Sequence, residues 1–173
     1  MSEADPRTVT YEEYMETKTL LLILLTTTVS CSQSKQVFDV NQPYDGFIVS
    51  QDIEIYVGDK ANWFKPTQEE VKEAEELLSE QIERLNTEQI NQENDCPIID
   101  QNLNKYLRQY IGYINVFGEK VILMNMLWSD KIENHKGLRS ELAMVLDGCS
   151  RYWKVKVNLT SDIVYDLEIN GSA

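Results

Sequence analysis

The sequence has few of the residues from which catalytic and metal sites are usually built. It contains a single histidine, His135, and only three cysteines, Cys31, Cys96 and Cys149. Zinc sites repeat cysteine and histidine at short spacings, and these four residues follow no such pattern. The sequence also has no Gly-x-Ser-x-Gly motif and no glycine-rich phosphate loop. We therefore expect no metal, no cofactor and no catalytic residue.

Basic residues are also scarce. Lysine and arginine number 16 against 29 aspartates and glutamates, which gives a net charge of −13 at pH 7. Such a chain repels the phosphate backbone of nucleic acids and the head groups of anionic lipids. The charge balance therefore argues against nucleic acid as a partner, and any attachment to a membrane has to come from another feature.

No hydrophobic run is long enough to span a bilayer. The longest aliphatic stretch, Leu20 to Leu25, has six residues, whereas a spanning helix needs about 20. Its length instead matches the hydrophobic region of a secretory signal, and the small residues after it lead to Cys31, where a bacterial lipoprotein carries its lipid. We predict a lipoprotein-type signal over residues 15–31, with lipidation at Cys31. The protein is then anchored in the bacterial cell envelope, on the periplasmic side or at the cell surface.

The residues before this signal favour a start at Met15. Residues 1–14 carry four acidic side chains against Arg7, which is the wrong sign for the beginning of a signal. A start at Met15 places Lys18 just before the aliphatic run and makes residues 1–14 a spurious extension. Thr28 departs from the leucine that is typical of lipoprotein signals. A cleaved ordinary signal and a buried segment of the fold therefore stay as alternatives.

Lipidation of Cys31 leaves two cysteines, Cys96 and Cys149. An even number of cysteines in an oxidising compartment is typical of a disulfide framework. The sequence does not give the distance between their Cα atoms, on which a disulfide depends. A Cys96–Cys149 disulfide and two free thiols are therefore both open.

The folded domain is predicted over residues 47–173, behind a polar tether at 32–46. Residues 47–57 alternate between apolar and polar, as in a half-buried strand. Thr67 and Glu70 then form a capping box, the signature of a helix start. One side of the helix carries an apolar stripe, and the opposite side carries a row of glutamates that we interpret as its solvated side. That stripe consists of Val71, Ala74, Leu77, Leu78, Ile82 and Leu85.

The second half of the chain has the pattern of an antiparallel sheet. Residues 106–116 and 121–128 are two apolar strands around a turn that contains Gly118. Residues 153–159 alternate between apolar and polar, Ile163, Tyr165, Leu167 and Ile169 alternate against Asp166 and Glu168, and a short polar turn joins the two stretches. We predict an α+β fold in which one long helix packs on a curled antiparallel sheet of about five strands.

Two resemblances follow from these features. The element order over residues 47–173 resembles the cystatin-like arrangement, with NTF2-like and PepSY-type sheets as alternatives. The signal, together with the stretches 107–113, 145–148 and 170–173, resembles small lipid-anchored or secreted proteins of Bacteroidota. These latter families have no assigned activity, so the resemblance implies no catalytic residue, and a shared fold does not carry a function.

Aromatic residues on the predicted strands are the best candidates for ligand contacts. Arg108 lies between Tyr106 and Tyr110, where it can form a cation–π stack or meet a carboxylate ligand. Aromatic side chains also favour strands for packing reasons alone, which is the competing interpretation. The candidate ligand-binding residues are Arg108, Tyr110, Trp128 and Trp153.

These observations favour a non-catalytic binding or interaction module that is held at the membrane by its N-terminal lipid. Its ligand is a protein or a small molecule that the sequence does not name. A cystatin-type inhibitor or a structural domain is the alternative. A small hydrolase is the least favoured function, because it needs a carboxylate or a thiol placed against His135, which lies in a polar stretch.

Overall fold

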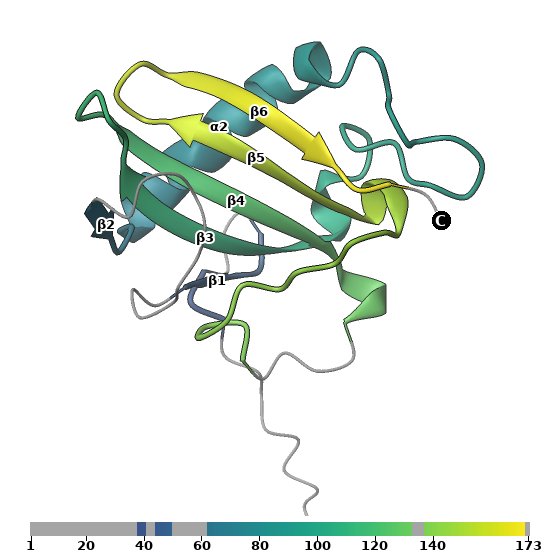
Figure 1. The fold of residues 1–173 in the computed structure, drawn as a ribbon, viewed down its shortest axis with the longest axis horizontal. Helices are drawn as coiled ribbons and strands as arrows, with labels where there is room; N and C mark the ends of the chain where they lie inside the picture. The colour runs from purple at the N-terminus through teal and green to yellow at the C-terminus, as the bar shows by residue number, and fades with distance from the viewer. Residues whose placement is uncertain (1–37, 41–43, 50–61, 133–136, 172–173) are drawn as a thin grey trace, which may run out of the picture. The chain divides into compact units, whose positions relative to one another are not determined.

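The computed structural model describes residues 38–40, 44–49, 62–132 and 137–171. One helix, α2 (Gln68–Leu85), packs on one face of a six-stranded sheet, behind which it runs in Figure 1. The strands are β1 (Gly46–Ile48), β2 (Asn62–Phe64), β3 (Tyr106–Ile114), β4 (Lys120–Trp128), β5 (Tyr152–Asn158) and β6 (Ile163–Ile169). This confirms the predicted α+β class, and the arrangement is consistent with the cystatin-like one.

The sheet has the order β1-β3-β4-β5-β6, and β2 also pairs with β3. The pairs from β2 to β6 are antiparallel, but β1 runs parallel to β3 beside Arg108–Tyr110. Of the strand predicted at 47–57, the structure shows β1 at its start, and residues 50–61 lie outside the described residues. An alternating pattern predicts that a strand exists but not the direction in which it pairs.

Helix α2 begins as the sequence predicts. The Thr67 hydroxyl accepts a hydrogen bond from the Glu70 amide at 3.2 Å, and the Thr67 amide donates to the Glu70 carboxylate at 2.9 Å. The face of α2 that meets the sheet carries Val71, Ala74, Glu75, Leu78 and Ile82, all buried. Glu75 is the one charged residue among them, so a carboxylate lies inside the core.

The opposite face of the sheet is partly covered by residues 137–147, which form no strand. Buried amide side chains on β3 and β4 hold this covering segment. Gln109 Nε2 donates to the carbonyls of Leu138 and Glu141 at 2.7 Å, and Asn125 Nδ2 donates to the Ala143 carbonyl at 3.0 Å. Apolar side chains then fill the space between segment and sheet, as with Leu107, Leu127 and Leu138.

The folded unit reaches further towards the N-terminus than the predicted boundary at residue 47. Val40 is buried in the main core and bridges to Gly46, and the ring of Phe38 lies 5.3 Å from that of Phe47. Residues 38–40 and 44–46 therefore belong to the fold rather than to a tether. Two apolar residues in a polar stretch are too few to give a periodic signal, which is why the sequence does not show this packing.

Candidate functional site

Arg108 lies in the core and not at the mouth of a pocket. Its side chain is 0% exposed, and its Nε donates to Glu75 Oε1 at 2.9 Å. Nη1 donates to the Tyr106 carbonyl, and the guanidinium stacks on the ring of Tyr44 with 3.7 Å from Cζ to the ring centroid. A cation–π stack is present, but with Tyr44 instead of the neighbouring strand tyrosines. The guanidinium is thereby closed off from a carboxylate ligand.

The other predicted ligand residues share this buried environment. The Tyr110 hydroxyl donates a hydrogen bond to Glu75 Oε1 at 2.8 Å. Burial is the main cause that raises the pKa of Tyr110, and the nearby Glu75 charge is the second. Trp153 is buried, and Trp128 is half-buried, both with edge-on contacts to the ring of Tyr106. The structure therefore brings these residues together as core, as the packing interpretation predicts for strand aromatics.

Glu75 is the residue of this cluster that sequence reasoning missed. It lies four residues after Val71 and three before Leu78, so it falls on the apolar stripe of the helix. A glutamate at such a position is almost never fully buried unless it is paired. That placement was the available signal for a buried ion pair.

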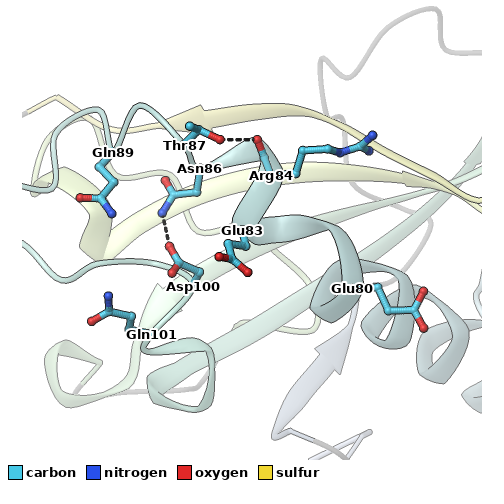
Figure 2. A pocket seen from close by; sticks show the side chains of 8 residues that line it. All are labelled: Glu80, Glu83, Arg84, Asn86, Thr87, Gln89, Asp100 and Gln101. Carbon is cyan, nitrogen blue, oxygen red and sulfur yellow. Dashed lines mark hydrogen bonds between the residues drawn. The ribbon is translucent and has the colours of Figure 1, made fainter.

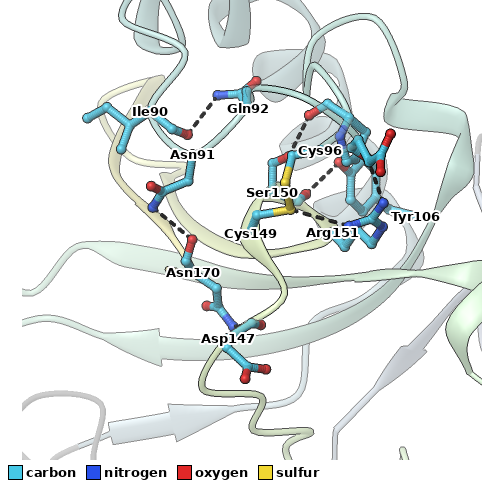
Figure 3. The surroundings of a disulfide bond; sticks show 12 residues. Ile90, Asn91, Gln92, Cys96, Tyr106, Asp147, Cys149, Ser150, Arg151 and Asn170 are labelled. Carbon is cyan, nitrogen blue, oxygen red and sulfur yellow. Dashed lines mark hydrogen bonds between the residues drawn. A yellow bond between two sulfur atoms is a disulfide. The ribbon is translucent and has the colours of Figure 1, made fainter. Parts of the chain in front are cut away.

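Cys96 and Cys149 form a disulfide, with 6.1 Å between their Cα atoms (Figure 3). Around it, Ser150 Oγ donates to the Pro97 carbonyl and Arg151 Nη2 to the Asp95 carbonyl, both at 2.5 Å. The bond thus ties the loop after α2 to the start of β5. Disulfides persist in oxidising compartments, which indicates that this domain works outside the cytoplasm. His135 lies outside the described residues.

A polar hollow lies beside the C-terminal end of α2 (Figure 2). It is lined by Glu80, Glu83, Arg84, Asn86, Thr87, Gln89, Asp100 and Gln101. Asn86 Nδ2 already donates to Asp100 at 2.5 Å and to Gln92 at 2.8 Å. Within the described part of the chain, no group of three His, Cys, Asp or Glu side chains is placed to hold a metal ion. The hollow is therefore a weak candidate for a functional site.

A stronger candidate is the end of the sheet where two turns lie side by side (Figure 1). We call this the hairpin end: residues 115–119 between β3 and β4, and residues 159–162 between β5 and β6. Asparagine organises both turns. Asn115 Oδ1 accepts from the amides of Phe117 and Glu119 at 2.9 and 3.0 Å. Asn158 Oδ1 accepts from Thr160 and Ser161 at 2.9 and 3.2 Å.

Glu119 joins the two turns of the hairpin end. Its Oε2 accepts from Asn115 Nδ2 at 2.8 Å and from Asn158 Nδ2 at 2.9 Å. The Lys120 amide also donates to Thr160 Oγ1 at 3.0 Å. Turns are usually among the more mobile parts of a protein, but this set of contacts fixes the two turns as one unit.

The hairpin end is also fastened to α2. Lys120 Nζ lies 2.5 Å from Glu70 Oε1 at the start of the helix, and Gln81 Nε2 donates to the Asp162 carbonyl at 2.9 Å. Burial raises the pKa of Glu70, but the hydrogen bonds from Lys120 and Thr67 outweigh burial and leave this pKa below its ordinary value. The carboxylate is therefore kept charged for its contact with Lys120.

The tip of this fixed unit presents two adjacent apolar side chains to solvent. Val116 is 72% exposed and Phe117 is 83% exposed. Gly118 follows them at φ +79°, a conformation that glycine adopts without strain and that closes the turn. Turn positions ordinarily carry polar residues or glycine, so Val116 and Phe117 are unexplained by the needs of the turn itself.

Comparisons with protein-family models, with curated proteins and with solved structures found no match, so the functional argument rests on this geometry. Among the described residues, no helix has the length and apolar character that crossing a membrane would require.

Proposed function

We propose that the protein is a non-catalytic interaction module of the bacterial cell envelope, lipid-anchored at Cys31, that contacts a partner protein through the hairpin end. The observation that carries this proposal is the exposure of Val116 and Phe117 on a turn held by Asn115 and Glu119. A turn whose backbone is already held by hydrogen bonds loses little backbone freedom when it binds, and aromatic side chains are among those that contribute most to binding energies. The extracytoplasmic setting agrees with the disulfide.

Photo-crosslinking tests the contact. We expect a photoreactive phenylalanine analogue at position 117 of the full chain to give one discrete adduct in the native bacterium. The same analogue at Glu76, an exposed helix position with a side chain that is 62% exposed, is expected to give none. Once the captured partner has been identified and purified, Phe117→Ser should raise the Kd of its complex with this protein by about tenfold or more.

Ile90→Ser is the matched control, because Ile90 is also an exposed apolar residue, at 55%, but lies in the loop after α2. It should leave the Kd unchanged. Equal adducts at positions 76 and 117, or an unchanged Kd for Phe117→Ser, would show that the hairpin end is not the contact. The same two variants test the alternative. Stoichiometric inhibition of a papain-type cysteine protease that Phe117→Ser abolishes and Ile90→Ser retains would favour a cystatin-type inhibitor.

The lipid anchor is tested separately. We expect the mature full chain to begin at Cys31, to carry the mass of a diacylglyceryl group and to partition into detergent. Cys31→Ala should move it to the aqueous phase, whereas Ser30→Ala should not, because a small residue before the cysteine is kept. A mature chain with unmodified residues before Cys31 would contradict the anchor and leave the partner contact untouched.

A further inference from the structure

Four polar and aromatic side chains gather on the sheet face that α2 does not cover. They come from three strands: Tyr113 on β3, Lys156 on β5, and Tyr165 and Asp166 on β6. Val155, Val157 and Val164 point to the helix side, where they join the main core. Tyr113, Lys156 and Tyr165 are half-buried and Asp166 is exposed. We refer to these four residues as the outer-face cluster.

A β-bulge shapes the cluster. Lys154 pairs with Glu168 and Lys156 pairs with Tyr165, so the single residue Val155 is opposed by two residues of β6. Asp166, one of those two, has φ +51°, in the left-handed region that an aspartate tolerates better than most residues. A bulge of this kind turns a side chain away from its regular direction. Here it lets the Asp166 carboxylate reach Lys156 Nζ at 2.8 Å.

The two tyrosines reach towards each other across the sheet. The Tyr113 pKa is raised first by burial and then by the nearby Tyr165 and Asp166 side chains. Strands β4 and β5 lie between these residues, and neighbouring strands are about 4.8 Å apart, so the two backbones are separated by about 14 Å. Two side chains that start so far apart approach each other only if both extend along the surface of the sheet, which places two half-buried aromatic rings on this face.

The charges of the cluster cancel. Lys156 is neutralised by Asp166 and also lies 5.8 Å from the centroid of the Tyr165 ring. In a chain with a net charge of −13, this is a locally neutral surface that combines two aromatic rings with hydrogen-bond donors and acceptors. Such a surface suits a neutral ligand that has both apolar C–H groups and many hydroxyls, and it has no net positive charge to attract a phosphate or a sulfate.

We propose that the outer-face cluster binds a hexopyranose unit of a neutral glycan. The C–H face of the sugar ring packs on the tyrosine rings, and its hydroxyls bond to Lys156 and Asp166. The proposal stands apart from the partner contact at the hairpin end, because it uses none of the same residues. The bulge at Asp166 is then a positioning feature that holds the carboxylate beside the rings.

The test uses the folded full-length protein and a panel of neutral hexose oligosaccharides, with maltoheptaose, cellohexaose and mannohexaose as probes. Saturation-transfer NMR and calorimetry should show binding of at least one probe with a Kd of about 1 mM or tighter. Tyr165→Ala should weaken that binding by about tenfold or more. Asp166→Asn should weaken it as well, while keeping the backbone, because asparagine tolerates a positive φ.

Glu168→Gln is the matched control, since Glu168 is an exposed β6 carboxylate that pairs with Lys154 at 2.9 Å outside the cluster. It should bind the same probe with unchanged Kd. Tyr165→Phe keeps the aromatic ring. Binding by this variant, together with loss of binding by Tyr165→Ala, would assign the loss to the missing ring and not to the fold. The proposal is overturned if no probe binds, if Tyr165→Ala binds as the wild type does, or if an anionic polygalacturonate binds more tightly than the neutral probes.

Discussion

We expect Arg108→Met to lower the free energy of unfolding by about 3–5 kcal/mol, which is the cost of leaving one member of a buried ion pair without its partner. Arg108 and Glu75 have side chains that are 0% and 1% exposed, and their contact is 2.9 Å. Removing the guanidinium leaves the Glu75 carboxylate in a core from which water is excluded. Chemical denaturation followed by tryptophan fluorescence measures the loss.

The same ion pair predicts that stability returns when both of its charges are removed together. Glu75 Oε2 and Arg108 Nη2 have no hydrogen-bond partner among the described residues, so the burial of the two charges is incompletely compensated. The triple variant Glu75→Leu, Arg108→Met, Tyr110→Phe removes the charges together with the hydroxyl that depends on them. We expect it to regain most of the stability that Arg108→Met loses.

Lys72→Met is the control for this prediction. Lys72 pairs with Glu76 at 3.5 Å on the exposed side of the same helix, with side chains that are 69% and 62% exposed. An exposed pair of this kind contributes about 0.2–1 kcal/mol, so the variant should stay near the wild-type stability. A loss of less than about 1 kcal/mol for Arg108→Met would show that the core relaxes around the remaining carboxylate.

The second large effect is expected from the disulfide. The double variant Cys96→Ala, Cys149→Ala should lose about 2–5 kcal/mol, because the unfolded chain regains the freedom that the closed loop denies it. The two cysteines are separated by 53 positions, so the bond closes a long loop. Urea unfolding of the purified domain, with and without dithiothreitol, measures the effect.

Reductant provides the internal control. Dithiothreitol should shift the unfolding midpoint of the wild type towards that of the double variant, and it should leave the double variant unchanged. Equal stability of the oxidised and reduced wild type would contradict a stabilising role for the bond. It would assign the stability of this region to contacts such as Ser150 with Pro97 and Asn91 with Asn170.

Features that depend on nearby residues could be predicted from the sequence. The capping box at Thr67 and Glu70 marked the start of α2, and alternation marked the existence of β5 and β6, although the bulge in β6 puts Val164 and not Tyr165 on the helix side. The turn around Gly118 was also visible, because a tight turn needs a glycine at a defined place. In each case the pattern and the structure that it predicts lie within the same short stretch of chain.

Features that depend on distant residues could not be predicted. Nothing near Arg108 in the sequence identifies Glu75 or Tyr44 as its partners, and Asn158 is unrelated to Glu119 until the strands pair. The burial of Arg108 could not be predicted for this reason: an arginine between two tyrosines has the same local pattern whether its side chain is exposed or covered. The hairpin end was missed because its rigidity comes from such long-range hydrogen bonds.

The bulge in β6 lies at an edge of the sheet. On one side, β1 pairs with Arg108–Tyr110 of β3 and β2 pairs with Gly112–Ile114, whereas β6 is the outer strand on the other side. An outer strand with a regular row of free amides and carbonyls is a template for a further strand, and so for aggregation. Asp166 interrupts that row with its left-handed backbone and its charge. The distortion that places a carboxylate beside two tyrosines therefore also protects the protein from edge-to-edge association with its own copies.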